Sequence, residues 1–359
     1  MSATVSDPLL QLVWYSTAAL LVLTLLLLVL ALVMHKERDK RNLHRKEATE
    51  QWTPLLFSWI YDTEQTAEPL PSLDAAGFGV VVQLWLQLEQ TVRGSASERL
   101  ADLAQRLGFV PVMHQWLDSF DNEKKLTAIM TLGLVQDKKA FAKLMPYVID
   151  SRTLFSLVAA RSLLSIDPWL GLPVVLSQLH REDWSVSRLA GLLVRLPSEL
   201  VVRALTESAE RATVKELGRL IKLMSLLSPL DCQPLVLLAL EKYPDQMELM
   251  TTACSSAISP DLLPALRLLH NSPHWQVRVQ LAKALGRLGS KEDVPLLLIL
   301  LQDKSWWVRY RAAQSLLQLP DVSAQEQQHW LQLDDPFARD ILHQVLDETE
   351  RMKRTAWTG

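Results

Sequence analysis

Glycine and cysteine are both scarce in this 359-residue chain, which contains 11 glycines and two cysteines. Its longer apolar runs contain few β-branched residues, so β-sheet is disfavoured and an all-α fold is expected. The two cysteines, Cys232 and Cys254, lie among apolar or small residues and lack the C-x-x-C spacing of metal and redox sites. We therefore expect both to pack in the core as free thiols, and a disulfide between them is the less favoured alternative.

The chain also lacks the motifs that usually identify an enzyme or a nucleic-acid-binding protein. No phosphate-binding glycine loop, dinucleotide fingerprint or nucleophile elbow occurs. The formal net charge is −3 and basic residues form no long tract outside one short segment, so no nucleic-acid partner is expected. His270 and His274 have the i, i+4 spacing of a zinc-binding pair, but Pro273 between them indicates a turn. We expect no catalytic, cofactor-binding or metal-binding residues.

Charge is absent from residues 9–34, which begin at Leu9, end at Met34 and consist mainly of Leu, Val and Ala. As a helix, this segment would extend about 39 Å, enough to cross a hydrocarbon core of about 30 Å. Trp14 and Tyr15, near its start, suit the headgroup layer of a bilayer. A cleaved signal peptide is the alternative, but the basic n-region and the A-x-A-like cleavage site are missing. The segment is therefore predicted to be a transmembrane helix.

Basic residues crowd the C-terminal side of this segment, whereas none precedes it. The cluster consists of Lys36, Arg38, Lys40, Arg41, Arg45 and Lys46. The positive-inside rule then predicts a single-pass protein of the inner (plasma) membrane, with its N-terminus outside and the rest of the chain in the cytoplasm. The same six side chains are candidates for contact with anionic lipids, although a topology signal alone would also explain them.

An internal period of 31 residues runs through most of the remaining chain. One series of apolar residues at this spacing contains Leu132, Leu163 and Val194; a second contains Leu223, Cys254, Leu285 and Leu316. The two series are separated by 29 residues. Each period contains two helical patterns, most clearly residues 291–302 and 306–319, preceded by another helix over residues 275–288. Seven such helical hairpins predict an α-solenoid that follows one transmembrane helix.

These hairpins resemble the HEAT-repeat family, in particular the short bacterial-type repeats that also occur in phycobilin lyases. The resemblance is carried by the Trp-Gln-Val-Arg run that ends at Arg278, by residues 281–286, and by Trp307-Val308-Arg309 with the following Arg311. It implies an extended protein-binding surface. With the predicted anchor, the expected function is a membrane-anchored scaffold or adaptor, and a component of a bacterial inner-membrane complex is one form of it. The alternative is a lyase-like enzyme, which the transmembrane segment and the lack of a reactive cysteine or histidine cluster disfavour.

The remaining segments are expected to flank the repeats. The predicted division is a transmembrane helix at 9–34, a basic juxtamembrane segment and linker at 35–72, an N-terminal helical cap at 73–121, the repeat array at 122–319 and a C-terminal capping helix and tail at 320–359. A short helix is expected to begin at Thr53 and Pro54, and a third hypothesis places residues 52–60 on the bilayer surface. A helix is expected over about residues 74–92; its apolar stretch, residues 77–88, is only about 12 residues long and is interrupted by Gln83 and Gln87, so it is too short to span a membrane and is expected to be buried.

The candidate partner-binding residues lie in the last repeats. They are Trp275, Arg278, Trp307, Arg309 and Arg311. Tryptophan and arginine are enriched in binding hot spots, which motivates the choice. Trp306 matches Trp275 in repeat phase, so both are expected to wedge between repeats, whereas the adjacent Trp307 points about 100° away and is expected to be exposed. Internal pairing with acidic residues of the turns is the alternative for Arg278 and Arg309.

Overall fold

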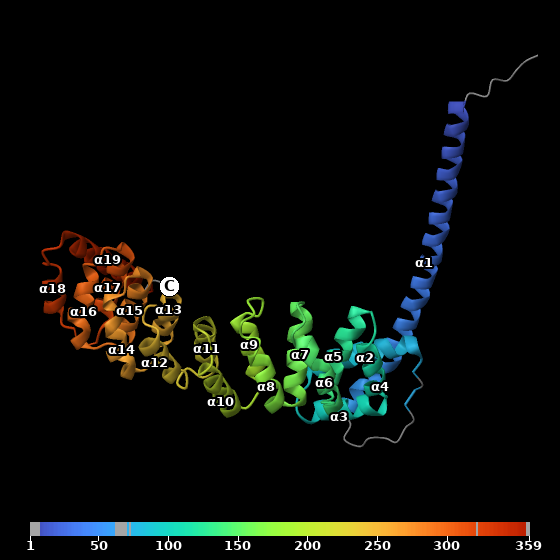
Figure 1. Cartoon of the computed structure of the whole chain (residues 1–359), viewed down its shortest axis with the longest axis horizontal. Coiled ribbons are helices and arrows are strands. Elements are labelled where there is room, and N and C mark those ends of the chain that lie inside the picture. Colours follow the sequence, from blue (N-terminus) through green and yellow to red (C-terminus); the bar gives the residue numbers. More distant parts are fainter. Residues whose placement is uncertain (1–7, 62–69, 72, 321, 357–359) are drawn as a thin grey trace, which may run out of the picture. The chain divides into compact units, whose positions relative to one another are not determined.

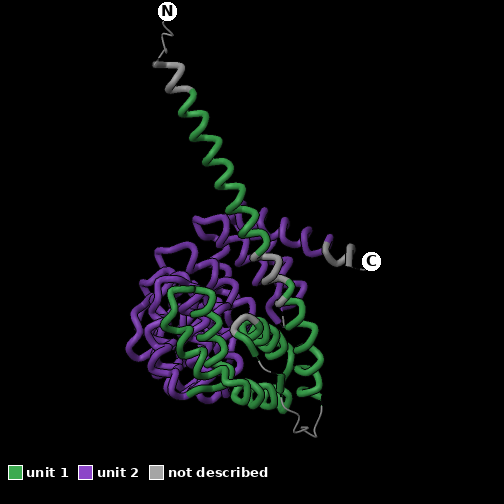
Figure 2. The backbone as a smooth tube through the Cα atoms, turned by 90° about the vertical axis from the view of Figure 1, so that its right-hand side faces the viewer, with its two compact units in different colours: residues 1–137 green, residues 138–359 purple. Residues whose placement is uncertain are grey.

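The computed structural model describes residues 8–61, 70–71, 73–320 and 322–356; for residues 8–13, 37–42, 44, 75–76 and 352–356 it describes the backbone only. Within these ranges every regular element is an α-helix or a 3-10 helix, in agreement with the all-α prediction. The chain forms two compact units, residues 1–137 and residues 138–359 (Figure 2). The predicted domain boundaries are finer than this division and stay predictions.

Unit 1 begins with one long helix, α1, which runs without interruption from Pro8 to Tyr61 (Figure 1). Its stretch Trp14–Lys36 is apolar and long enough to cross a membrane, and none of it is buried in the structure. A membrane span and a signal sequence both fit that description. The last turns of the same helix are different, because Trp52, Leu56 and Ile60 are all buried.

Two expectations for the end of α1 are wrong. No helix begins at Thr53, since Pro54 lies inside α1. The main apolar side of residues 52–60 is also not available to a bilayer, because its buried side chains, spaced four residues apart, pack against α2 (Ala75–Thr91) and α3 (Ser95–Arg106). Phe57, which is 43% exposed, lies outside this buried side. Trp59 secures this contact by donating from Nε1 to the carbonyl oxygen of Arg99 at 3.0 Å.

Unit 1 is completed by α4 (Phe109–Leu117) and α5 (Asn122–Leu134), which pack against each other. Helix α2 is buried, as predicted: Trp85 is inaccessible, donates from Nε1 to the carbonyl oxygen of Leu100 at 2.8 Å and meets the ring of Phe109 edge-on. Asp74 caps α2 by accepting from the N–H of Gly77 at 2.7 Å. Gly94, at φ +65, lies between α2 and α3 in a conformation that other residues rarely adopt.

Unit 2 is a succession of helical hairpins (Figure 1). Its even-numbered helices are α6 (Phe141–Val148), α8 (Pro168–Leu176), α10 (Ser198–Ala209), α12 (Gln233–Lys242), α14 (Leu263–Arg267), α16 (Val294–Leu301) and α18 (Ala324–Trp330). Its odd-numbered helices are α7 (Thr153–Ile166), α9 (Val186–Leu193), α11 (Val214–Leu227), α13 (Met247–Ser256), α15 (Trp275–Leu288), α17 (Trp306–Gln318) and α19 (Pro336–Ala356). Short 3-10 helices lie at Lys138–Ala140, Pro260–Leu262, Leu268–Asn271 and Lys291–Asp293. Each odd-numbered helix packs against the next odd-numbered helix, so the hairpins form a two-layered stack.

The predicted repeat phase is confirmed with one correction. The members of the two series that are fully buried are Leu132, Leu163, Leu223, Cys254, Leu285 and Leu316. Val194 is 68% exposed, whereas its neighbour Leu193 is 1% exposed and occupies the core position. One residue along a helix turns a side chain by about 100°, so an error of a single position moves it from the core to the surface. With Leu193 in the series, the uneven steps of 31 and 29 residues become two steps of 30.

The C-terminal end contains one more helix than expected. The prediction had a single capping helix after residue 319, but residues 324–356 form the hairpin of α18 and α19, and α19 packs against α17. Asp335 caps α19 and accepts from the N–H of Phe337 at 2.9 Å. Ile341 and Val345 face the core, whereas Phe337 is 62% exposed.

Helices α15 and α17 approach each other most closely at Gly286. A β-carbon on this glycine would lie 2.7 Å from Cβ and 3.0 Å from Cα of Ser315. The hydroxyl of Ser315 uses the space by donating to the carbonyl oxygen of Ala282 at 2.7 Å. The absence of a side chain at Gly286 therefore sets the spacing between these two helices.

Replacing Gly286 by alanine is expected to destabilise the protein by about 1–3 kcal/mol, because the added methyl group overlaps Ser315. The matched control is Gly191→Ala in α9, where an added Cβ meets nothing within 4 Å. This control should be neutral or stabilising by up to about 1 kcal/mol, as for glycine in an open helix. Urea denaturation of the full chain in neutral detergent, followed by circular dichroism, measures both. Equal shifts for the two variants would contradict the close-approach argument.

Candidate partner-binding surface

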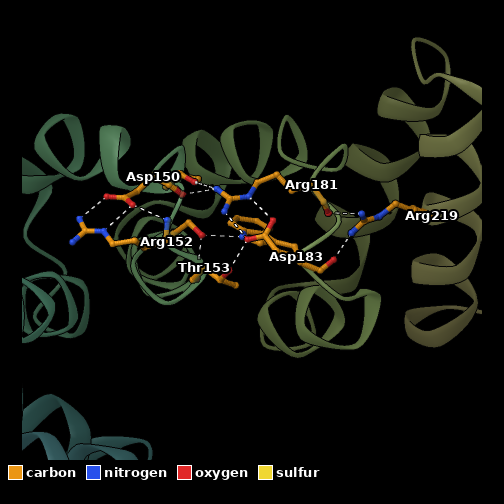
Figure 3. A network of polar contacts seen from close by, with 9 residues as sticks. Asp150, Arg152, Thr153, Arg181, Asp183 and Arg219 are labelled. Atoms are coloured by element: carbon orange, nitrogen blue, oxygen red, sulfur yellow. Dashed lines mark hydrogen bonds and ion pairs between the residues drawn. The ribbon is translucent and has the colours of Figure 1, made fainter.

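Arginine–aspartate contacts connect the turns that precede α7 and α9 (Figure 3). Arg181 donates to the carbonyl oxygen of Asp150 at 2.7 Å and forms two hydrogen bonds with the carboxylate of Asp183, at 3.0 and 2.7 Å. The hydroxyl of Thr153 donates to the same carboxylate at 2.7 Å. These contacts, the one from Arg181 first, hold the pKa of Asp183 well below its ordinary value. They join successive hairpins through their turns.

The same network continues to either side. Arg152 forms two hydrogen bonds with the carboxylate of Asp150, at 3.0 and 2.7 Å. Arg219 on α11 donates to the backbone carbonyl oxygens of Arg181 and Trp184 (Figure 3). Two of these three guanidinium groups, those of Arg181 and Arg219, donate to backbone carbonyl oxygens. We therefore interpret this network as stabilising the turns and not as a binding site.

Arg278 and Arg309 perform a similar structural task near the C-terminal end. Arg278 donates from Nε and Nη2 to the carboxylate of Asp303, at 2.5 and 2.9 Å. It also donates from Nη1 to the carbonyl oxygen of Ser272 at 2.6 Å, six residues earlier. Arg309 donates to the carbonyl oxygen of Asp303 at 3.2 Å, again six residues earlier. These contacts agree with the internal pairing considered as the alternative for both arginines.

Asp303 is the acidic centre of this turn. Burial raises its pKa, but the hydrogen bonds from Arg278 and from the N–H of Ser305 outweigh burial, and the pKa is lowered below 3.8. The Ser305 contact, at 2.8 Å, also satisfies a backbone donor at the start of α17. Asp303 therefore connects α15 to the turn before α17.

Three aromatic residues occupy the first turn of three successive odd-numbered helices. Trp275 and Trp306 are the first residues of α15 and α17, Phe337 is the second residue of α19, and the three are spaced at intervals of 31 residues. Trp275 and Trp306 are 41% and 40% exposed, so the expectation that they wedge between repeats is wrong. The residue that does so is Trp184, which is fully buried and donates from Nε1 to the hydroxyl of Ser156 at 2.9 Å.

Trp307 and Arg311 lie one helical turn apart on α17. Trp307 is 55% exposed, as predicted, and contacts the ring of Trp306 edge-on at 4.9 Å between centroids. Trp306 in turn stacks on Tyr310 at 5.0 Å with an interplanar angle of 14°. Arg311 donates to the amide oxygen of Gln314 at 2.6 Å. The result is a rigid, exposed aromatic cluster bordered by a guanidinium group.

Tyr310 and Phe337 belong to this surface and were missed by sequence reasoning. The hydroxyl of Tyr310 donates to the carboxylate of Glu348 on α19 at 2.6 Å, which ties the cluster to the next hairpin. The guanidinium of Arg309 lies 5.3 Å from the ring centre of Phe337. The regular spacing of Trp275, Trp306 and Phe337 was the available signal.

The predicted lipid-contact residues are placed on α1. Those with described side chains are exposed: Lys36, Arg45 and Lys46. The side chains of the others lie outside the described residues: Arg38, Lys40 and Arg41.

Both cysteines are free and buried, as predicted. Burial raises the pKa of Cys254 to about 12, so its thiol stays protonated at neutral pH and is a poor nucleophile. His270 donates from Nδ1 to the carbonyl oxygen of Arg267 at 2.8 Å. No group of three or more His, Cys, Asp or Glu side chains within the described part of the chain is arranged to hold a metal ion.

Comparison with known families matches residues 259–357 to HEAT repeats. The match covers α14 to α19, so it includes α18 and α19 as well as the repeats whose residues carried the resemblance. No curated protein matches the chain. HEAT repeats are commonly protein-interaction scaffolds.

Replacing Arg278 by methionine is expected to destabilise the protein by about 2–4 kcal/mol, because the nearly buried carboxylate of Asp303 loses its partner. The same change at Arg311, whose bond is to a neutral amide, should cost less than about 0.5 kcal/mol. A carboxylate whose pKa is lowered by folding stabilises the folded protein at pH values above its unfolded pKa. This contribution is lost as the pH falls through the folded-state pKa. The effect of Arg278→Met should therefore shrink below pH 3.8, the ordinary value for Asp303. Denaturation of both variants between pH 3 and pH 7 tests this; equal effects would place Arg311 in a structural role too.

Proposed function

We propose that this chain is a single-pass membrane protein whose cytoplasmic HEAT-type repeats bind a protein partner, so that it acts as a scaffold or adaptor and not as an enzyme. We further propose that it serves a bacterial inner-membrane complex. The observation that carries the proposal is the exposed aromatic cluster on α17 in a region that matches HEAT repeats.

The aromatic cluster supports a protein partner. Large aromatic side chains dominate binding energies because they bury much area with few rotatable bonds, and Trp and Arg are the residues most enriched in hot spots. Trp307 is already held by Trp306, and Trp306 by Tyr310, so little conformational entropy would be lost on binding. Of the five predicted residues, Trp307 and Arg311 best fit direct contact, and Trp275 holds the equivalent place on α15. Arg278 and Arg309 would support them by fixing the turns.

The geometry of α1 supports an anchor in preference to a removable signal. Exposing the apolar stretch Trp14–Lys36 to water is unfavourable, and a bilayer would relieve that cost. The same helix continues to Trp52, Leu56 and Ile60, which are buried in unit 1. Cleavage after the apolar stretch would cut a helix whose far end belongs to the core of a folded unit.

The exposed cations beyond the apolar stretch favour a cytoplasmic location for the repeats. The part of α1 from Lys36 to Trp52, 16 residue-to-residue steps, would form a stalk of about 24 Å between the bilayer and the buried core of unit 1. A helical stalk limits how the repeats can tilt, unlike a flexible linker.

The full chain is expected to remain in the membrane pellet after alkaline carbonate extraction, since a complete span is buried in lipid. Leu23→Arg combined with Leu27→Arg should release it, because each charge at the centre of a span opposes insertion by about 2.5–3.5 kcal/mol. Protease added to everted plasma-membrane vesicles should digest the repeats. Release of the unchanged chain by carbonate would contradict the proposed membrane anchor. Protection of the repeats from protease would contradict their proposed cytoplasmic location.

Trp307→Ala is expected to reduce partner recovery after cross-linking in membranes, since loss of one hot-spot side chain costs at least about 2 kcal/mol. The matched control is Trp169→Ala, which removes an equally exposed tryptophan from the even-numbered helix α8. Both variants should keep the melting temperature of the parent. A large loss of stability for Trp307→Ala would make it a packing residue. Unchanged recovery would remove it from the binding surface.

A further inference from the structure

Charge is distributed unequally between the two layers of unit 2. Helices α7, α9, α11, α13, α15 and α17 contain ten basic and two acidic residues. Helices α8, α10, α12, α14 and α16 contain three of each. The chain as a whole is slightly acidic, so this excess of cations belongs to one layer.

The first cationic cluster lies on α15 and α17. Lys283 and Arg287 lie four residues apart on α15, and α17, which carries Arg311, packs against α15. Burial, then Arg311, then Arg287, lower the pKa of Lys283, in agreement with this placement. Arg287 donates to the carbonyl oxygens of Cys254 and Ala257, at 3.0 and 2.9 Å, and Arg311 bonds to an amide. Among the ion pairs between described residues, none includes these three cations. Such an arrangement would be stabilised by an anion from outside.

A second cluster lies on the earlier hairpins. Burial, and then the guanidinium group of Arg195, lower the pKa of Arg161. Arg161 is on α7 and Arg195 directly follows the end of α9, which packs against α7. Arg161 and Arg195 thus repeat the juxtaposition of like charges seen near Lys283.

Exposed apolar side chains lie on the same lines as the cations. Trp307 precedes Arg311 by four residues, Leu226 follows Lys222 by four, and both apolar side chains are exposed. Residues four apart on a helix share one face. A ligand for this layer would therefore have both carboxylates and apolar side chains.

We propose that the odd-numbered helices bind an acidic, extended segment of another protein through a cationic face. This face consists of Arg161, Arg195, Lys222, Lys283 and Arg311, and Arg287 borders it while holding the backbone of Cys254 and Ala257. Arg161 on α7 and Lys283 on α15 are separated by four helix-to-helix steps, or about 32–40 Å at 8–10 Å per step, and Lys222 on α11 lies between them. An extended chain covers that distance in about 10–12 residues, so the ligand has two groups of carboxylates at roughly this spacing. The inference rests on the proposed protein-binding function and names the chemistry of the partner.

The gap between the clusters favours a peptide over lipid or nucleic acid. Helix α13, which lies between α11 with Lys222 and α15 with Lys283, contains no lysine or arginine. A nucleic-acid backbone presents negative charge at regular short intervals, and an anionic bilayer presents it continuously. Neither matches a row of cations that is interrupted at α13, whereas a segment with separate acidic groups does.

The test uses the full chain in neutral detergent and fluorescent synthetic peptides, with affinity measured by anisotropy. One peptide carries two Glu-Leu-Glu-Glu groups joined by a ten-residue Gly/Ser spacer, and its control has glutamine in place of every glutamate. The acidic peptide should bind at least tenfold more tightly than the control. Lys283→Gln with Arg311→Gln should weaken it at least tenfold, as should Arg161→Gln with Arg195→Gln. Lys143→Gln, which removes an exposed cation from α6, should change the affinity less than twofold.

Three results would overturn the proposal. The first is that both double variants, with unchanged circular-dichroism spectra, bind the acidic peptide as the parent does. The second is that shortening the spacer to two residues leaves the affinity unchanged. The third is that phosphatidylglycerol vesicles or a single-stranded oligonucleotide bind to the protein and are weakened at least tenfold by the two double variants, while the acidic peptide does not bind. If the acidic peptide does not bind but Trp307→Ala still reduces partner recovery, the proposal of an acidic ligand is wrong while the proposed protein-binding function is supported.

Discussion

Packing between successive odd-numbered helices is the contact on which the rest of unit 2 depends. A single hairpin cannot bury its own apolar side, so each needs its neighbour. The contact uses one buried position per repeat: Leu163, Leu193, Leu223, Cys254, Leu285 and Leu316. Gly286 brings α15 and α17 close enough for Ser315 to reach the carbonyl oxygen of Ala282. The charged side chains of α15 and α17 therefore lie either near the start of the helix, as Arg278 and Arg309 do, or on its exposed side further along, as Lys283 and Arg311 do.

Position within the repeat decides what an arginine does in this protein. Arg278 and Arg309 stand three residues after the first residue of their helices and reach back to the carbonyl oxygen six residues earlier. Arg339 is the equivalent residue of α19 and makes the same bond to Leu333 at 2.7 Å. Arg311 is two residues beyond Arg309, which turns its side chain about 200° around α17, away from the turn. Arginines that look interchangeable in the sequence therefore divide into turn supports and candidates for binding.

Most of the helical architecture could be predicted from the sequence because the apolar period is regular. The bounds of α15, the buried cysteines and the exposure of Trp307 followed from helical spacing. The errors arose where tertiary contacts override local preference. Pro54 reads as a helix start, yet burial of Trp52 and Leu56 keeps α1 continuous across it. The cationic face escaped notice because its members come from separate repeats and form no tract in the sequence.

Helix α1 links the two chemical environments that the proposal requires. None of its apolar stretch is buried in the structure, whereas its last turns belong to the core of unit 1 through Trp52, Leu56 and Ile60. Because α1 is continuous from the apolar stretch to Tyr61, no loop separates the anchor from the core of unit 1. A rotation of the anchor would therefore also rotate this core. A flexible tether would leave a binding surface free to sample all orientations, which lowers its effective concentration toward a partner fixed in the same membrane. The continuity of α1 therefore suits a scaffold whose partner is also held at the bilayer.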